Sequence, residues 1–270
     1  MSAMTAQQQH LWARHIEGLA QAARGKKVVV VEGDDDRSFL EGVLNRVMHR
    51  RWQARIAVVV AEGRGRVLDW TGPQGHFAGH FGLVDRDTWT NAEVSAHQHD
   101  RPFLFVTSGW CLENLVLERA ALGELGAPLA QVLHDALPAW RAAGARWWVL
   151  HRWRSALAPW WSRLGAYGAP SPAVQALDEA RLRADLFGDV QRADLIALVA
   201  QWTQREQALV ALPPAEQWRS GIHGKAALQA LLAPTLSQRW PGQDRSQALG
   251  AALELGDDPA LSGLLALLRS

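Results

Sequence analysis

The feature that most constrains the fold is a run of four consecutive valines, Val28–Val31. A short, unbroken β-branched run is typical of a strand that is buried on both faces of a parallel sheet. Further strand-like apolar runs follow at 56–61, 81–84 and 103–106, with helical patterns or loops between them. Strands that alternate with helices through about residue 120 predict an α/β fold with a mostly parallel sheet.

Helices are expected within this core and after it. Apolar residues at helical spacing indicate helices at 5–23, 35–47 and 111–122, and a shorter one at 67–70. Beyond residue 122 the strand signals stop, and helical patterns occupy 127–143, 145–165, 172–186, 189–209, 213–219, 224–233 and 258–268. Pro159 predicts a kink or a break. The expected organisation is an N-terminal helix (1–24), an α/β core (25–122) and an all-helical C-terminal region (123–270).

Composition excludes several classes of protein. Of the 270 residues 48% are hydrophobic and 20% are charged, as in folded chains, and a net charge of +1 excludes a histone-like polycation. The single cysteine, Cys111, excludes an internal disulfide and a multi-cysteine zinc site. No apolar run approaches the roughly 20 residues that span a bilayer, and the first residues lack the apolar segment of a signal peptide. We therefore expect a cytoplasmic protein that does not enter a membrane.

Carboxylates gather where open α/β sheets keep their functional residues, just past the carboxyl ends of the strands. Glu32 follows the first strand, Asp36 lies in the first turn of the next helix, and Asp85 and Asp87 follow the third strand. If the first and third strands are neighbours, these four carboxylates converge, and their mutual repulsion requires a cation. Oxygen ligands suit Mg²⁺ or Mn²⁺, and two such ions can support phosphodiester cleavage.

Each of these segments also has an interpretation without a metal. The run Asp34–Asp36 can cap the helix and complement its dipole. The segment Asp85–Asp87 can be an exposed loop with a local ion pair. The joint pattern is harder to explain in this way. Glu-Gly follows one predicted strand, with an aspartate four residues after the glutamate, and Asp-x-Asp follows another predicted strand some fifty residues later.

This joint pattern resembles the Toprim fold, which topoisomerases, bacterial primases, recombination proteins and OLD-type nucleases share. The resemblance is carried by residues 29–36 (VVVEGDDD) and 81–87 (FGLVDRD) and covers about 25–120. The aspartate four residues after the glutamate is similar to the OLD-type arrangement, in which that position also binds metal. The resemblance implies two metal ions, held by Glu32, Asp36, Asp85 and Asp87, and a catalytic set of Glu32, Asp85, Asp87 and Lys225.

Over its whole length the chain is most similar to an uncharacterised bacterial group, domain of unknown function 4435, which joins a Toprim-like core to a helical tail. In that group a Glu-Asn pair opens a helix and a Gly-Lys pair follows later, as Glu113-Asn114 and Gly224-Lys225 do here. Glu113 is a candidate accessory residue, or it complements a helix dipole. Lys225 can neutralise the reacting phosphate, or it is a solvated lysine. One departure is that the loop 62–65 offers no clear additional aspartate ligand.

A stretch rich in arginine and tryptophan, residues 136–177, contains no acidic residue. Arginines neutralise phosphates and tryptophans stack on bases, as in proteins that bind single-stranded nucleic acid. For the tryptophans we favour packing in a helical core, whereas for the arginine face both interpretations stay open. Together with a second basic set before the second strand, the candidate nucleic-acid contacts are Arg146, Arg152, Arg154, Arg50 and Arg51.

Three classes of function remain. The first, implied by the resemblance and favoured by the full carboxylate set, is a metal-dependent nuclease, in the family's context one that acts in defence against phage or mobile DNA. The second is a non-catalytic nucleic-acid-binding or regulatory module, and the third is a subunit controlled by a partner ATPase. The chain has no G-x-x-x-x-G-K-[ST] loop, so any ATPase is a separate subunit. DNA and RNA are both candidate substrates, and a monomer and an oligomer are both compatible with the sequence.

Overall fold

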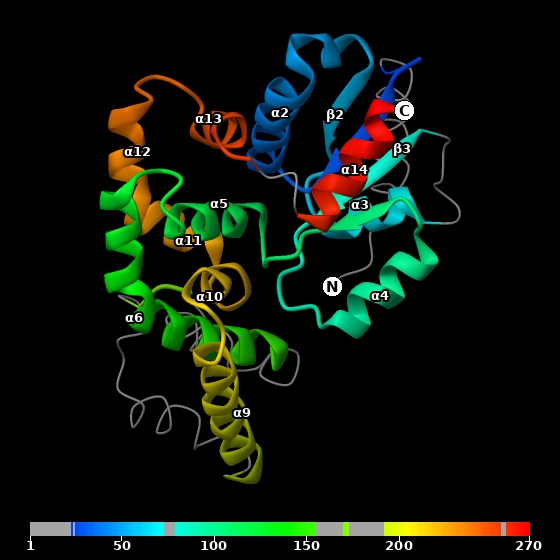
Figure 1. Ribbon diagram of the computed structural model, residues 1–270. Helices are drawn as coiled ribbons and strands as arrows, with labels where there is room; N and C mark the ends of the chain where they lie inside the picture. Colours follow the sequence, from blue (N-terminus) through cyan, green and yellow to red (C-terminus); the bar gives the residue numbers. More distant parts are fainter. Residues whose placement is uncertain (1–22, 24, 73–78, 155–169, 173–191, 255–257) are drawn as a thin grey trace. The chain divides into compact units, whose positions relative to one another are not determined.

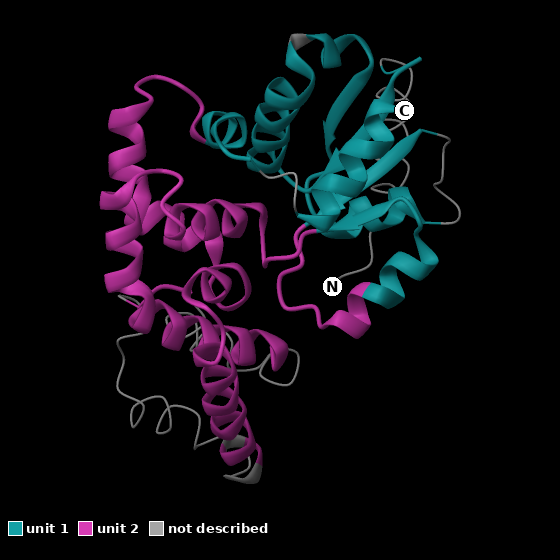
Figure 2. Cartoon of the chain, in the orientation of Figure 1, with its two compact units in different colours: residues 1–84, 95–106, 246–270 teal, residues 85–94, 107–245 magenta. Residues whose placement is uncertain are grey.

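The structure, a computed structural model, describes residues 23, 25–72, 79–154, 170–172, 192–254 and 258–270 (Figure 1). It is an α/β fold with an all-parallel four-stranded sheet, flanking helices and a helical C-terminal region, which confirms the expected fold class. The chain divides into two compact units, shown in Figure 2. Unit 1 comprises residues 1–84, 95–106 and 246–270, and unit 2 comprises residues 85–94 and 107–245.

The sheet of unit 1 has the strand order β2-β1-β3-β4. Its strands are β1 (Lys27–Val31), β2 (Ile56–Val60), β3 (His80–Val84) and β4 (Leu104–Val106). The valines of β1 are at most 2% exposed, as expected for a strand covered on both faces. Strand β1 pairs with β3 as well as with β2, which confirms that the first and third strands are neighbours.

Helices of unit 1 pack against this sheet through their apolar residues. Helix α2 (Asp34–Met48) buries Phe39, Val43 and Leu44, as its periodicity predicts. It is followed by the 3-10 helix η1 (His49–Ala54), and the short helix α3 (Arg64–Thr71) follows β2. Helix α14 (Pro259–Arg269) lies against β4, so it packs with the sheet although it comes from the expected C-terminal region.

Two glycines allow α2 and α13 (Arg245–Ala252) to cross closely. A methyl group added at Gly42 would collide with the carbonyl oxygen of Gln247, and one at Gly250 would collide with the carbonyl oxygen of Phe39. The backbones of the two helices are therefore almost in contact, and neither position has room for a side chain. The sequence did not predict α13, and the compact units do not follow the expected boundary between residues 122 and 123.

We predict that Gly42→Ala and Gly250→Ala each lower the free energy of unfolding by about 1–3 kcal/mol, because overpacking forces backbones apart. Urea titrations followed by circular dichroism measure this loss. Arg37→Ala, at the exposed end of α2 in a surface pair with Asp34, is the matched control and should cost about 1 kcal/mol or less. An equal loss in all three variants would contradict the close crossing.

Unit 2 contains the following helical segments: α5 (Leu112–Ala121), α6 (Ala127–Arg152), α9 (Arg192–Val210), α10 (Pro214–Gly221), α11 (Gly224–Ala227), the π-helical segment Leu228–Leu232 and α12 (Ala233–Arg239). Helix α4 (Asn91–Asp100), which begins in unit 2 and ends in unit 1, was not predicted. It buries none of its residues, so its sequence lacks the apolar period that reveals a helix.

The predicted division into helices 127–143 and 145–165 is wrong in its first part, because α6 continues through Gly144 as far as Arg152. A methyl group at Gly144 would collide with the carbonyl oxygen of Gly221, so this glycine is a packing position and not a joint. Pro159 lies outside the described residues, as do the expected N-terminal helix at 5–23, except for Ala23, and most of the expected helix at 172–186.

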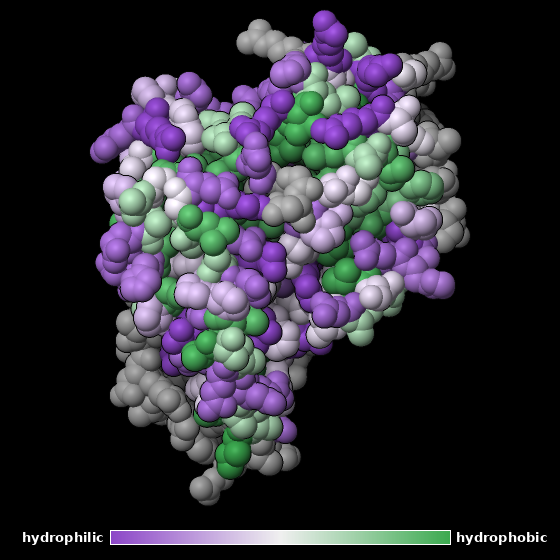
Figure 3. All heavy atoms as spheres, viewed as in Figure 1, coloured by the Kyte–Doolittle hydropathy of each residue, from purple (hydrophilic) through white to green (hydrophobic). Residues whose placement is uncertain are grey.

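No helix among the described residues is both long enough and apolar enough to cross a membrane. Figure 3 shows hydrophilic and hydrophobic side chains interspersed on the face in view. Large apolar side chains that are exposed include Ile196 and Val210 of α9, each more than half accessible.

Candidate metal centre

Asp85 is the residue around which the candidate site is built. It directly follows the last residue of β3 and is buried, with only 7% of its surface exposed. One carboxylate oxygen, Oδ1, accepts a hydrogen bond from the backbone N–H of Leu112, the first residue of α5, at 3.1 Å. The positive end of the α5 dipole therefore stabilises the Asp85 charge.

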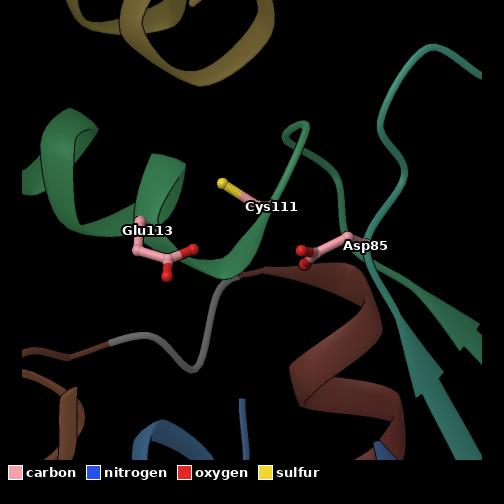
Figure 4. A group of neighbouring side chains, drawn as sticks. All are labelled: Asp85, Cys111 and Glu113. Atoms are coloured by element: carbon pink, nitrogen blue, oxygen red, sulfur yellow. The ribbon is translucent and has the colours of Figure 1, made fainter. Parts of the chain in front are cut away.

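Cys111 and Glu113 complete a cluster with Asp85. One potential ligand atom from each side chain lies within 4.8 Å of the others. Figure 4 shows the carboxylates of Asp85 and Glu113 pointing toward one another, with Cys111 and Glu113 at the start of α5. The expected place of Glu113, in the first turn of the helix that follows the fourth strand, is confirmed.

A buried amide, that of Asn114, ties the start of α5 to two other segments of unit 2. Its Oδ1 accepts from the backbone N–H of Cys111 at 3.0 Å. Its Nδ2 donates to the carbonyl oxygens of Trp218 at 2.6 Å and Ile222 at 2.7 Å. Asn114 is completely buried, so these hydrogen bonds fix α5 against the end of α10.

Gly224 fits against the same amide. A methyl group at this position would lie 2.6 Å from Asn114 Oδ1 and 2.7 Å from Cys111 Sγ, so only glycine permits the approach. The approach brings the next residue, Lys225, to the cluster, with its Nζ 3.4 Å from Asp85 Oδ2. Each of the two sequence pairs therefore supplies one structural and one charged residue. Asn114 and Gly224 pack against each other, whereas Glu113 and Lys225 carry the charges.

The electrostatics of the cluster favour a neutral thiol beside charged oxygen ligands. Burial, with the charges of Glu113 and Asp85, raises the pKa of the Cys111 thiol well above its usual range. The thiol also lies 3.1 Å from Asn114 Oδ1. The charge of Lys225 lowers the pKa of the thiol, but this effect is smaller than the effects that raise it.

Asp87 lies beside these groups in a strained turn. Its φ of 48° is left-handed, a conformation that aspartate tolerates better than most residues, and its N–H donates to the carbonyl oxygen of Trp110 at 2.8 Å. Burial lowers the pKa of His223, and the nearby charge of Asp87 partly opposes that shift. Asp85, Asp87 and Lys225 are thus neighbours within unit 2.

We predict that Asn114→Ala lowers the free energy of unfolding by at least about 3 kcal/mol, because three buried backbone groups lose their partner and each costs about 1–3 kcal/mol. Urea denaturation checks the value. Gln131→Ala, which removes an amide hydrogen bond on the exposed face of α6, should leave stability almost unchanged. A small effect at Asn114 would mean that this amide does not hold the site together.

Glu32 and Asp36 belong to unit 1. Glu32 lies just past β1 and pairs with Arg64, whose Nε is 3.3 Å from its Oε1. Asp36 is 4% exposed, and its Oδ2 accepts from the backbone N–H of Gly33 at 2.9 Å, so it caps α2, as the alternative interpretation of Asp34–Asp36 proposes. That these two carboxylates share a metal cleft with Asp85 and Asp87 stays a prediction.

The candidate nucleic-acid contacts have different surroundings. Arg152 donates from Nη1 to both carboxylate oxygens of Glu93, at 2.7 and 2.8 Å, and Arg146 lies 5.1 Å above the ring of Trp202. Arg154 and Arg51 are exposed, whereas the side chain of Arg50 lies outside the description. The pairing with Glu93 neutralises part of the charge that Arg152 would bring to a phosphate.

We predict that the Glu93–Arg152 pair stabilises the fold above about pH 4.5 and not at about pH 2. Hydrogen bonds from Arg152 and from the backbone N–H of Thr90 lower the pKa of Glu93 to about 2. The charged form therefore stabilises the folded state, and this contribution is lost as the pH falls through that range. It amounts to about 1 kcal/mol or less, since 40% of the Glu93 side chain is exposed.

Thermal unfolding of the wild type and Glu93→Gln checks this dependence. The wild type should have the higher Tm near neutral pH, and the two proteins should converge at about pH 2. A difference that stays constant across this range would show that the charge of Glu93 is not responsible.

Several tryptophans of the basic stretch are packing residues, as we favoured. Trp140 is 5% exposed and Trp147 is 7% exposed. Trp147 contacts the rings of Trp110, His151 and His223 at centroid distances of 4.8–5.1 Å. Trp160 and Trp161 lie outside the described residues.

The sequence matches no protein-family model, and no curated protein matches it. The resemblance to Toprim proteins therefore stays a prediction that rests on the two motifs in 29–36 and 81–87.

Sequence reasoning missed two parts of the site. It used Cys111 only to exclude a disulfide and a multi-cysteine zinc site, and it gave Asn114 and Gly224 no task beyond being members of the two pairs. Cys111 is buried, and its thiol belongs to the cluster with Asp85. The available signal was the Glu-Asn and Gly-Lys pairs, whose mutual contact only a tertiary structure reveals.

Proposed function

We propose that unit 2 carries the centre of a divalent-metal-dependent nuclease, which hydrolyses phosphodiester bonds in nucleic acid. The observation that carries the proposal is the meeting of Asp85, Glu113 and Lys225. Two carboxylates from separate segments converge on one place, and an ammonium group lies at the same place. This combination suits a cation and a phosphate that bind side by side.

The donor set fits Mg²⁺ or Mn²⁺ better than a soft metal. Carboxylate oxygens are the ligands that these ions prefer. A soft metal such as zinc prefers thiolate and imidazole ligands, and in this cluster Cys111 is the one group of that kind beside two carboxylates. We therefore assign Asp85 and Glu113 as the residues that hold the ion, which when bound would activate water and stabilise the leaving oxygen.

The chain's own residues supply the remaining electrostatics. The Lys225 ammonium offsets the charge of Asp85 and can meet the negative charge that grows on the reacting phosphate. The N-terminus of α5 stabilises the negative charge of Asp85 through the N–H of Leu112. Cys111 is buried beside these groups, with its thiol 3.1 Å from Asn114 Oδ1.

The Toprim resemblance adds Glu32, Asp36 and Asp87 as ligands, and a second ion, to this proposal. It also suggests a biological setting, defence against phage or mobile DNA, and a separate ATPase subunit as a candidate partner. Nucleic acid is the partner in every version, with Arg146, Arg154 and Arg51 among the candidate contacts.

We predict that Asp85→Asn and Glu113→Gln, which keep shape and remove one charge, each abolish most metal-dependent cleavage and weaken Mn²⁺ binding by at least about tenfold. Calorimetric titration with Mn²⁺ measures binding, and single- and double-stranded DNA and RNA serve as cleavage substrates. Asp135→Asn on the exposed face of α6 is the control. If both properties survive in Asp85→Asn and Glu113→Gln, the enzymatic proposal fails.

We predict the opposite pattern for Lys225→Met. Cleavage should fall by about 100-fold or more, because the transition-state charge loses its ammonium. Mn²⁺ should bind at least as tightly as in the wild type, because a competing positive charge leaves the carboxylates. Lys26→Met, which removes an ammonium from unit 1, should change neither property. Loss of Mn²⁺ binding in Lys225→Met would show that this lysine only organises the cluster.

A non-catalytic nucleic-acid-binding module is the second candidate, and one observation favours it. Asp85 and Glu32 each have a cationic partner from the chain itself, Lys225 and Arg64. Ion pairs of this kind can be purely structural. In that case nucleic acid would bind without cleavage in Mg²⁺ or Mn²⁺, whatever the state of Asp85.

A further inference from the structure

A pocket in unit 2 is lined by positively charged side chains, in contrast to the carboxylate cluster. Its volume is about 410 Å³, within the range that small-molecule ligands occupy. Arg86 and Arg205 line it together with three tryptophans, and no carboxylate is among its lining residues. It adjoins the cluster along the chain, since Arg86 follows Asp85 and Trp110 precedes Cys111.

The two guanidinium groups have no acidic partner among the residues that the structure describes. Arg86 donates from Nε to the carbonyl oxygen of Trp89 at 2.9 Å and from Nη2 to Asn91 Oδ1. Arg205 donates from Nη2 to the carbonyl oxygen of Ser220 at 2.8 Å. Within the described part of the chain, neither arginine forms an ion pair. Two of the five donors of Arg86 and one of the five of Arg205 are thus used, which leaves most of them for a ligand.

The guanidinium groups of Arg86 and Arg205 repel each other. Burial lowers the pKa of both arginines, and the charge of Arg86 lowers that of Arg205 further, so the two cations lie close enough to repel each other. The buried Nε–H of Arg205 also has no acceptor among the described residues. An anion would relieve the repulsion, as a cation does for clustered carboxylates.

The pocket holds both arginines in fixed positions. The Arg205 guanidinium lies 4.8 Å from the ring centre of Trp148, a cation–π contact that orients its plane. The backbone N–H of Arg86 donates to Thr107 Oγ1 at 3.0 Å, and that hydroxyl donates to the carbonyl oxygen of Gly109 at 2.9 Å. Glu93, in the first turn of α4, forms an ion pair with Arg152 and not with either arginine of the pocket.

We infer that this pocket binds the phosphate group of a nucleotide, with Arg86 and Arg205 on the phosphate oxygens and the base against Trp89. Guanidinium forks match phosphate geometry better than any other side chain. Tryptophan rings offer flat apolar surface, which suits a nucleobase. The inference is independent of the proposed cleavage, because it concerns binding by residues outside the carboxylate cluster.

The test is calorimetric binding in EDTA, where cleavage and metal binding play no part. Adenosine monophosphate should bind to one saturable site, and adenosine should bind at least about tenfold more weakly. Arg86→Gln and Arg205→Gln should each weaken the binding of adenosine monophosphate by about tenfold or more. Asp85→Asn should not weaken it, which separates this inference from the proposed nuclease.

The control is Arg239→Gln. Arg239 also stacks on a tryptophan, Trp240 at 5.2 Å, and also donates to a backbone carbonyl, that of Leu125, but it does not line the pocket. Affinity for adenosine monophosphate should be unchanged in this variant. If Arg205→Gln fails to fold, Arg205→Lys and the comparison of adenosine with its monophosphate on the wild type still decide the question.

Oligonucleotides with a terminal phosphate or a terminal hydroxyl distinguish two sources of the ligand. Displacement of adenosine monophosphate only by the phosphorylated strand identifies the end of a nucleic acid as the occupant. If neither oligonucleotide displaces adenosine monophosphate, the occupant of the pocket is a free nucleotide. No saturable binding of adenosine monophosphate, equal binding of adenosine, or an equal loss in Arg239→Gln would overturn the inference.

Discussion

The buried amide of Asn114 is the interaction on which the candidate site depends. It joins the start of α5 to the end of α10, and Gly224 packs on it because no side chain fits there. Glu113 precedes this amide in sequence and Lys225 follows that glycine, so one set of hydrogen bonds positions an acid and a base. The arrangement is rigid because a buried amide that loses a partner costs about 1–3 kcal/mol. Charged groups on such a frame need little reorganisation when a ligand arrives.

The second constraint is the burial of charge. Asp85 is nearly inaccessible, and burying an isolated carboxylate would cost several kcal/mol. Two features offset this cost: the N–H of Leu112 at the start of α5, and the ammonium of Lys225. Both features stabilise the negative charge of Asp85, the form of the carboxylate that binds a divalent ion. The thiol of Cys111 contributes no charge, because burial and the adjacent carboxylates keep its proton in place.

Local patterns predicted the sheet well, because a valine run such as Val28–Val31 is readable without knowing its neighbours, and strand ends place Asp85 and Glu32 directly. Close packing was not readable in this way. Gly144 was interpreted as a joint, although it allows contact with Gly221, a residue distant in sequence. Glu113 and Lys225 were singled out by a resemblance, and their positions beside Asp85 are visible only in the tertiary structure. Arg205 was missed because its pocket is assembled from segments that share no sequence pattern.

The segment Asp85-Arg86-Asp87 contributes to two sites of opposite charge, the carboxylate cluster and the arginine pocket. Its side chains alternate: Asp85 belongs to the carboxylate cluster, whereas Arg86 lines the arginine pocket. The backbone N–H of Asp87, whose φ of 48° is left-handed, donates to the carbonyl oxygen of Trp110 and so ties this segment to the residue before Cys111. Successive side chains of an extended chain point to opposite sides, so neighbouring positions can present a carboxylate to a cation and a guanidinium to a phosphate. The proposed metal centre and the proposed phosphate site are therefore one residue apart in the sequence.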